Sequence, residues 1–137
     1  MQDFKGNAAA PYALVDTDGT TIIGYYTLSG ASVTLDQIPP AVGKRIPRYP
    51  QIGAIRIGRL AVDDRFLRRR YGEALLMDAL ARIGNLASSA GFAFVVVDAK
   101  DDEASAFYQK YGFEPFPDTP SSLYMPMQTV FTLVGRR

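Results

Sequence analysis

The side chains of this chain that could do chemistry are carboxylates, tyrosines and arginines, because its 137 residues include no histidine and no cysteine. Histidine is the commonest general base, and cysteine supplies thiolate nucleophiles, disulfides and zinc ligands. Catalysis therefore has to depend on carboxylates, tyrosines, backbone dipoles or the reactivity of a cofactor. No metal site is expected.

Tyr108 is the strongest candidate for a catalytic residue. A phenol with a pKa of about 10 is protonated at neutral pH and can donate a proton to a leaving group. On a helix Tyr108 lies about 100° around from Phe107, which favours one aromatic ring that packs and one that faces a cleft. A structural tyrosine that packs beside Phe107, Tyr111 and Phe113 is the alternative.

Positive charge is concentrated in the middle of the chain, although the net charge is only +1. Two acidic residues, Asp63 and Asp64, lie in the same window. The basic residues there are Lys44, Arg45, Arg48, Arg56, Arg59, Arg65, Arg68, Arg69 and Arg70. Such a segment can attract the phosphates of a nucleotide cofactor or of RNA, and a solvated arginine surface is the alternative.

The first half of the chain predicts strands around turns that contain glycine or proline. The predicted strands are residues 12–16, 21–29, 32–38 and 54–62. In the last of these, Ile55, Ile57 and Arg59 are expected on one face, and Leu60 and Val62 on the other. The alternation changes phase near Gly58, which predicts a β-bulge.

The second half predicts two helices among further strands. Apolar residues recur with the helical period from 69 to 89, and Gly91 ends that helix. A second helix runs from 101 to 111 with Gly112 as its left-handed cap. The predicted strands are residues 92–97, 114–116 and a terminal segment within 122–133. Alternating strands and helices indicate an α/β fold with a mixed sheet.

Two segments together resemble the cofactor-binding half of the GNAT superfamily of acetyl-CoA-dependent N-acetyltransferases. The first is Leu60-Ala61-Val62-Asp63 with the arginine-rich turn that follows it, and the second is the run from Ala106 to Phe113. The resemblance covers residues 20–127 and implies acetyl transfer from a thioester to an amine. It also implies a mixed, mostly antiparallel sheet flanked by helices, with a central pair of splayed parallel strands. Residues 1–137 would form a single GNAT-like domain whose N-terminal part is short for the family.

The resemblance assigns acetyl-CoA to the strand and to the turn after it. In the family the turn reads Arg/Gln-x-x-Gly-x-Gly/Ala, and its backbone amides hold the pyrophosphate. The six positions here are Leu67, Arg68, Arg69, Arg70, Tyr71 and Gly72, of which only the last glycine matches. Arginine side chains can also bind phosphate. Backbone groups of Leu60, Ala61 and Val62 pair with the pantetheine arm in the family, and their amides can form an oxyanion hole.

In this scheme Tyr108 protonates the departing CoA thiolate. An α-amine with a pKa of about 7.7–8.0 is substantially neutral near pH 8, whereas a lysine amine with a pKa of about 10.4 needs a base. The missing histidine therefore favours an α-amine acceptor and direct attack. Water, Glu73 and Asp98 are the weaker candidates for a base.

A wider set of segments resembles a narrower branch, the toxins of toxin–antitoxin pairs that acetylate the α-amine of aminoacyl-tRNA. These segments are residues 24–29, 48–50, 58–62 and 97–102. The branch implies that Arg45, Arg48 and Arg59 bind the tRNA, and it implies a homodimer and a ribbon-helix-helix antitoxin. Two alternatives stay open: a GNAT enzyme that acetylates a small amine or a protein N-terminus, and an inactive descendant that binds phosphate or RNA.

Composition agrees with a globular protein of one domain. Hydrophobic residues make up 47% and charged residues 21% of the chain. No apolar run approaches the roughly 20 residues that a membrane-spanning helix needs, and no signal peptide precedes residue 16. A cytoplasmic location without a membrane partner is therefore expected.

Overall fold

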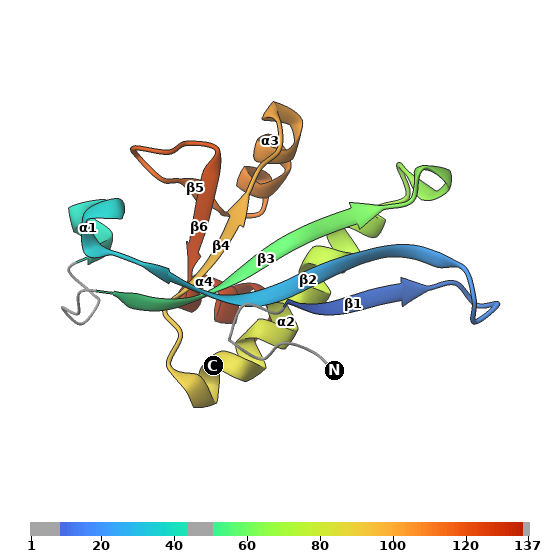
Figure 1. Ribbon diagram of the computed structural model, residues 1–137, viewed down its shortest axis with the longest axis horizontal. Coiled ribbons are helices and arrows are strands. Elements are labelled where there is room, and N and C mark those ends of the chain that lie inside the picture. The colour runs from blue at the N-terminus through green and yellow to red at the C-terminus, as the bar shows by residue number, and fades with distance from the viewer. Residues whose placement is uncertain (1–8, 44–50, 136–137) are drawn as a thin grey trace.

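A computed structural model of the chain describes residues 9–43 and 51–135, which form one sheet with helices on its faces (Figure 1). The strands are β1 Ala10–Val15, β2 Ile22–Val33, β3 Ile52–Val62, β4 Phe94–Asp98, β5 Glu114–Pro115 and β6 Ser122–Pro126. The helices are α1 Pro40–Gly43, α2 Tyr71–Ala90, α3 Asp102–Lys110 and α4 Met127–Leu133, with 3₁₀ turns at Leu35–Gln37 and Asp64–Phe66. None of these helices is long and apolar enough to cross a membrane.

The sheet has the strand order β1-β2-β3-β4-β6-β5. Strands β3 and β4 pair in parallel, and the other neighbouring strands in the described residues pair antiparallel. This confirms the predicted mixed, mostly antiparallel sheet with a parallel pair at its centre.

The parallel pair opens toward one end. Strand β3 pairs with β4 only over residues 54–57, opposite residues 94–97, although β3 continues to Val62. Figure 1 shows the two strands diverging, with α3 beyond the end of β4. The splayed arrangement is therefore as predicted, and it leaves the backbone of residues 58–62 beside an opening.

A β-bulge lies where the two strands part, as the sequence predicts. The register of β2 against β3 shifts between Tyr26 and Leu28, so that β3 contains one extra residue. A Cβ atom on Gly58 would lie 2.5 Å from Oγ1 of Thr27, so the backbone there has no room for a side chain. The same Oγ1 accepts a hydrogen bond of 3.1 Å from the N–H of Arg59. Gly58 and Thr27 thus hold the bulge in place.

The bulge changes which side chains of β3 face the core. Ile55 and Ile57 lie in the core under α2, and Leu60 and Val62 pack against that same core. The predicted placement of Leu60 and Val62 on the opposite face is therefore wrong. The extra residue shifts the alternation by one position and returns both side chains to the α2 side.

Helices α2 and α4 cover one face of the sheet, above the larger core. Most of the apolar residues that recur along α2 are buried in that core, whereas Leu86 near the end of the helix is 46% exposed. The five most buried of them, each at most 3% exposed, are Leu75, Leu76, Ala79, Leu80 and Ile83. Gly91 ends the helix at a φ of +74°, a conformation that glycine adopts at little cost.

A smaller core lies on the opposite face, beside α1. Its buried members are Val33, Ile38, Ile52, Ala54, Phe94, Val96, Phe116 and Tyr124. The two cores together bury both faces of β4, which agrees with the continuous apolar run of residues 92–97.

Two predictions of strand are wrong in part. Strand β6 ends at Pro126, and residues 127–133 form α4, because Met127 and Val130 bury their side chains at helical spacing. Residues 32–38 form no separate strand. Strand β2 continues to Val33, and the Thr34 N–H then donates to the Gln37 side chain at 2.7 Å, which starts a 3₁₀ turn.

Candidate active site

Helix α3 lies between two pockets that follow one another along β3. Its residues Ala104 and Tyr108, one turn apart, border the first pocket, and its residues Phe107 and Lys110 border the second together with Tyr111, which caps the helix. The helix begins as predicted, because the carboxylate of its N-cap residue Asp101 accepts a hydrogen bond of 2.8 Å from the Ala104 N–H. One helix therefore presents a different face to each pocket.

The first pocket, here called the Tyr108 pocket, has a volume of about 290 Å³ and occupies the opening between β3 and β4. Its lining residues are Tyr25, Gly58, Arg59, Leu60, Ala61, Asp98, Lys100, Ala104 and Tyr108. The fold thus brings the predicted catalytic tyrosine together with Leu60 and Ala61 of the predicted cofactor strand and with Arg59.

The ring of Tyr108 is packed, and it also borders the pocket. The side chain is 7% exposed, and its ring meets Phe107 and Phe113 edge to face with centroids 5.4 Å away in both cases. Burial raises the pKa of Tyr108 above its ordinary value, and the charge of Asp98 raises it further. The phenol is therefore protonated at neutral pH. The ring thus packs as a structural tyrosine does, and its catalytic role stays a prediction that its place at the pocket allows.

The two carboxylates considered as bases lie in different places. Asp98 ends β4 at the Tyr108 pocket, forms an ion pair with Arg56 and accepts a hydrogen bond of 2.7 Å from the Ser122 hydroxyl. Glu73 borders the second pocket instead, 3.8 Å from a guanidinium nitrogen of Arg70. Asp98 alone of the two lies beside Tyr108, and its oxygens already have partners.

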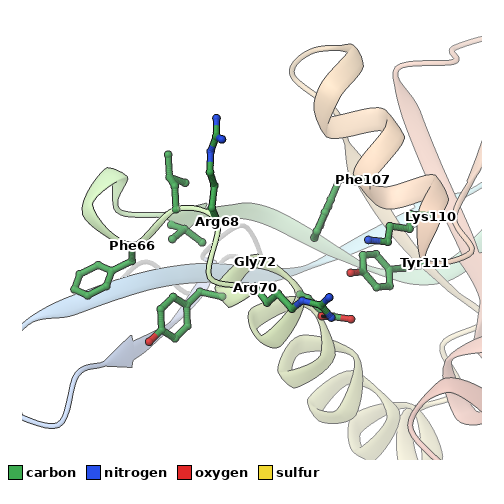
Figure 2. Close-up of a pocket in the computed structure, with 11 residues that line it drawn as sticks. Phe66, Arg68, Arg70, Gly72, Phe107, Lys110 and Tyr111 are labelled. Atoms are coloured by element: carbon green, nitrogen blue, oxygen red, sulfur yellow. Dashed lines mark ion pairs between the residues drawn. The ribbon is translucent and has the colours of Figure 1, made fainter.

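The second pocket, here called the arginine pocket, has a volume of about 350 Å³ and lies between the turn after β3, the start of α2 and the end of α3 (Figure 2). Its lining residues are Val62, Phe66, Leu67, Arg68, Arg70, Tyr71, Gly72, Glu73, Phe107, Lys110 and Tyr111. Five residues predicted to bind the cofactor are among them. Arg69 is not among them, and its guanidinium lies over the ring of Phe66, 5.9 Å from the centroid.

The turn that leads into α2 has a strained backbone. Arg68 and Arg70 have φ angles of +66° and +63°, and they are the non-glycine residues of the described chain with positive φ. That conformation costs roughly 1–2 kcal/mol for a residue with a Cβ atom, and such strain is concentrated at functional sites. Arg70 also precedes the first turn of α2, whose free N–H groups favour an anion. The cations and the turn together fit the phosphates of a nucleotide.

A family model for the acetyltransferase (GNAT) domain matches residues 42–122. This chain belongs to the GNAT family. It is therefore an N-acetyltransferase, and the predicted family and fold are confirmed.

Two curated relatives of this GNAT chain are similar to it over most of its length. It is 32% identical over 138 residues to the probable toxin TacT of Sinorhizobium fredii, an alignment that covers 96% of this chain and 76% of that protein. It is 35% identical over 114 residues to the tRNA-acetylating toxin of Mycobacterium tuberculosis. That alignment covers 83% of this chain and 68% of that protein.

Two solved structures are similar to the GNAT chain in fold and sequence. AtaT complexed with acetyl-methionyl-tRNAfMet superposes with a TM-score of 0.83 at 26% identity, covering 91% of this chain and 75% of that one. AtaTR bound with AcCoA superposes with a TM-score of 0.77 at 25% identity, covering 91% and 74%.

The structure adds residues that the sequence patterns do not single out. Tyr25 and Lys100 border the Tyr108 pocket, and Lys110 borders the arginine pocket. Lys110 follows Phe107 by three positions on α3, a spacing that could have indicated it, whereas Tyr25 and Lys100 reach their pocket only through tertiary packing. Arg45 and Arg48 lie outside the described residues.

Proposed function

We propose that this GNAT enzyme is a toxin that transfers an acetyl group from acetyl-CoA to the α-amine of an aminoacyl-tRNA. The observation that carries the proposal is the Tyr108 pocket, where a protonated phenol faces the open backbone of β3 next to a cationic pocket. Similarity to a tRNA-acetylating toxin and to AtaT, whose complex contains acetyl-methionyl-tRNA, supports the substrate class.

Acetyl-CoA is the proposed acetyl donor, and its phosphates would lie in the arginine pocket. Arg68 and Arg70 supply positive charge there, with Tyr71 and Gly72 at the start of α2, and Arg69 is proposed to add charge from beside the pocket. The backbone of residues 60–62 would pair with the pantetheine arm, since Leu60 and Ala61 border the Tyr108 pocket and Val62 borders the arginine pocket. The AcCoA-bound structure of AtaTR supports this donor.

In the proposed reaction, the α-amine nitrogen attacks the thioester carbonyl carbon directly. A C–N bond forms, the C–S bond breaks, and the nitrogen loses a proton to water. The Tyr108 hydroxyl donates a proton to the departing sulfur and is then reprotonated from solvent, which balances the protons. Backbone N–H groups of residues 60–62 would stabilise the negative charge on the carbonyl oxygen.

The tRNA would approach through the Tyr108 pocket. Arg59 borders that pocket, and its exposed guanidinium is proposed to contact the acceptor end. Arg45 and Arg48 are proposed to do the same. By its resemblance to the toxin branch, the enzyme is further proposed to act in the cytoplasm as a homodimer that a ribbon-helix-helix antitoxin neutralises.

Induced expression in a bacterial host tests this function. Growth should stop with the natural chain and continue with Tyr108→Phe at equal protein levels, and tRNA extracted from the arrested cells should carry N-acetylated amino acids. Unimpaired growth with abundant folded protein would contradict the toxin role. Arrest without acetylated tRNA would indicate another amine as acceptor.

A further inference from the structure

Asp98 lies at the point where the two central strands part. Strands β3 and β4 pair in parallel as far as Ile57 and Val97, and Asp98 is the next residue of β4. It borders the Tyr108 pocket and also a small pocket of about 70 Å³ beside β6. Asp98 therefore stands beside the opening in which acetyl transfer is proposed to occur.

The two strands that neighbour β4 fix the position of the Asp98 carboxylate. Arg56 of β3 forms an ion pair with one carboxylate oxygen, and the Ser122 hydroxyl of β6 donates a hydrogen bond of 2.7 Å to the other. A carboxylate has about four lone-pair sites, so these two partners leave room for further donors. The Asp98 side chain is 58% exposed, which gives a ligand access to it. The carboxylate is thus oriented by the protein and can still accept an N–H group.

Asp98 supplies a charge that does not suit a phosphate. Among the described residues that line the Tyr108 pocket it is the one carboxylate, whereas Arg59 and Lys100 are cations. A carboxylate repels phosphate and attracts an amine that carries N–H groups. The end of an aminoacyl-tRNA has both kinds of group, because its α-amine is partly protonated near pH 7 and a phosphate lies one ribose away. The pocket therefore has charges that complement this acceptor.

The position of Asp98 also suits the direction of attack. Backbone of β3 borders the Tyr108 pocket on one side, and Asp98 of β4 and Tyr108 of α3 border the same pocket. The charge of Asp98 helps to raise the pKa of Tyr108, which indicates that the two groups lie close together. Positive charge develops on the amine nitrogen when it attacks the thioester, and a carboxylate beside it stabilises that charge.

We propose that Asp98 binds the acceptor amine, with Arg56 and Ser122 as positioning residues that orient its carboxylate. The inference rests on the proposed function, because it names the contact by which the same acceptor is recognised. The carboxylate accepts an N–H of the amine and leaves the nitrogen lone pair free to attack. The proton balance of the reaction is unchanged, since the nitrogen still loses its proton to water. An acceptor with a hydroxyl in place of the amine loses this attraction.

Two amide-linked tRNAs test the contact without any reaction. One ends in an amino acid and the other in the matching α-hydroxy acid, and fluorescence titrations at about pH 7 give the ratio of their dissociation constants. The natural chain should bind the amine about tenfold more tightly, the gain expected for one charge-assisted hydrogen bond. Asp98→Asn should bind both tRNAs equally. Ser122→Ala should reduce the preference about threefold, because it removes one neutral hydrogen bond that orients the carboxylate.

Asp102→Asn is the matched control. It removes the same charge at the first residue of α3, which is exposed and does not border the Tyr108 pocket, so the tenfold preference should persist. Loss of a negative charge by itself strengthens the binding of any tRNA. A general effect of charge therefore predicts tighter binding of both tRNAs at an unchanged ratio, whereas the proposed contact predicts loss of the ratio.

The outcomes separate this inference from the proposed function. A folded natural chain that binds neither tRNA would overturn both. Equal binding of the two tRNAs by the natural chain, or a tenfold preference that Asp98→Asn keeps, would overturn the amine contact alone. A lower melting temperature of Asp98→Asn with an unchanged ratio would assign Asp98 to the anchoring of β4 instead. Should Asp98→Asn fail to fold, the ratio in Ser122→Ala decides, and an unchanged ratio there would contradict the inference.

Discussion

The two pockets on either side of α3 are lined by different kinds of chemical group. Backbone and a packed ring form much of the Tyr108 pocket: its bulge is fixed by Gly58 and Thr27, and the Tyr108 ring is held by two aromatic neighbours. Exposed cations on a strained turn form much of the arginine pocket, where the Arg70 side chain is 88% exposed. The difference matches the two tasks proposed for these pockets, which are proton transfer and phosphate binding. Proton transfer depends on position, whereas phosphate binding depends mainly on charge.

This comparison explains why the arginine turn can depart from the family pattern. A replaced glycine changes the geometry of a phosphate contact, but long cationic side chains adapt to the change. No such adjustment is available to the opening between β3 and β4, because its backbone is fixed by strand pairing and by the bulge. Changes at the Tyr108 pocket should therefore affect catalysis most, and changes at the arginine pocket should affect binding.

The largest effect is expected from Tyr108→Phe. The variant keeps the ring that packs against Phe107 and Phe113 and removes only the hydroxyl, so kcat should fall about 100-fold or more while the KM for acetyl-CoA changes little. Steady-state kinetics and a thermal melt measure both effects. A kcat within threefold of the natural value would show that Tyr108 does not take part in the proposed step. The Tyr108 pocket would then be no more important for catalysis than the arginine pocket.

Gly24→Ala should disturb the Tyr108 pocket through the backbone. A Cβ atom at Gly24 would lie 2.6 Å from the carbonyl oxygen of Ala61 and 2.7 Å from Leu75. Unfolding in urea should show a loss of about 1–3 kcal/mol of stability, together with lower activity as β3 moves. The control is Gly30→Ala in the same strand, where no atom lies within 4 Å. Equal stabilities for the two variants would show that the end of β3 can move away from a side chain at position 24 without loss of stability.

Arg70→Gly should separate the effect of backbone strain on stability from the effect of positive charge on acetyl-CoA affinity at the arginine pocket. Glycine relieves the left-handed backbone, so the variant should be about 1 kcal/mol more stable than Arg69→Gly, whose residue has no positive φ. Affinity for acetyl-CoA should still fall because a cation is lost. Urea unfolding and calorimetry measure the two effects. An Arg70→Gly variant less stable than Arg69→Gly would contradict the strained turn.

The smallest effect is expected from pH. The pKa of Tyr108 is raised, so the acid stays protonated as pH increases and is lost only above its ordinary value of about 10. The kcat/KM should rise toward pH 8 as the acceptor amine loses its proton and then stay level to about pH 9.5. A pH–rate profile checks this. An alkaline decline with a midpoint below pH 9 would assign the acid to another group.

Local patterns predict the parts of this fold that depend on local physics. Helix α2 follows from its apolar period and from Gly91, and α3 follows from Asp101 and Gly112. Helix α4 is too short for its period to distinguish it from a strand, and burial of Met127 and Val130 decides its form. The face occupied by Leu60 depends on the number of residues in a bulge, which pairing with β2 determines.

In the candidate site, too, some features follow from local sequence and others depend on tertiary packing. Order and spacing could predict that Tyr108 and the turn of residues 67–72 border the candidate site, because each belongs to a contiguous segment. The direction of Arg69 toward Phe66 and the charge of Lys110 across the pocket depend on how α2 and α3 meet. Such contacts between distant segments are not encoded in any single stretch of sequence.

Transfer of labelled acetyl from acetyl-CoA to purified aminoacyl-tRNA tests the central claim most directly. The same tRNA with its α-amine formylated, and the deacylated tRNA, serve as matched acceptors. The proposed function predicts label on the free α-amine only, and little with Tyr108→Phe. No transfer to the free amine by a folded enzyme that binds acetyl-CoA, or equal transfer to the formylated tRNA, would contradict it.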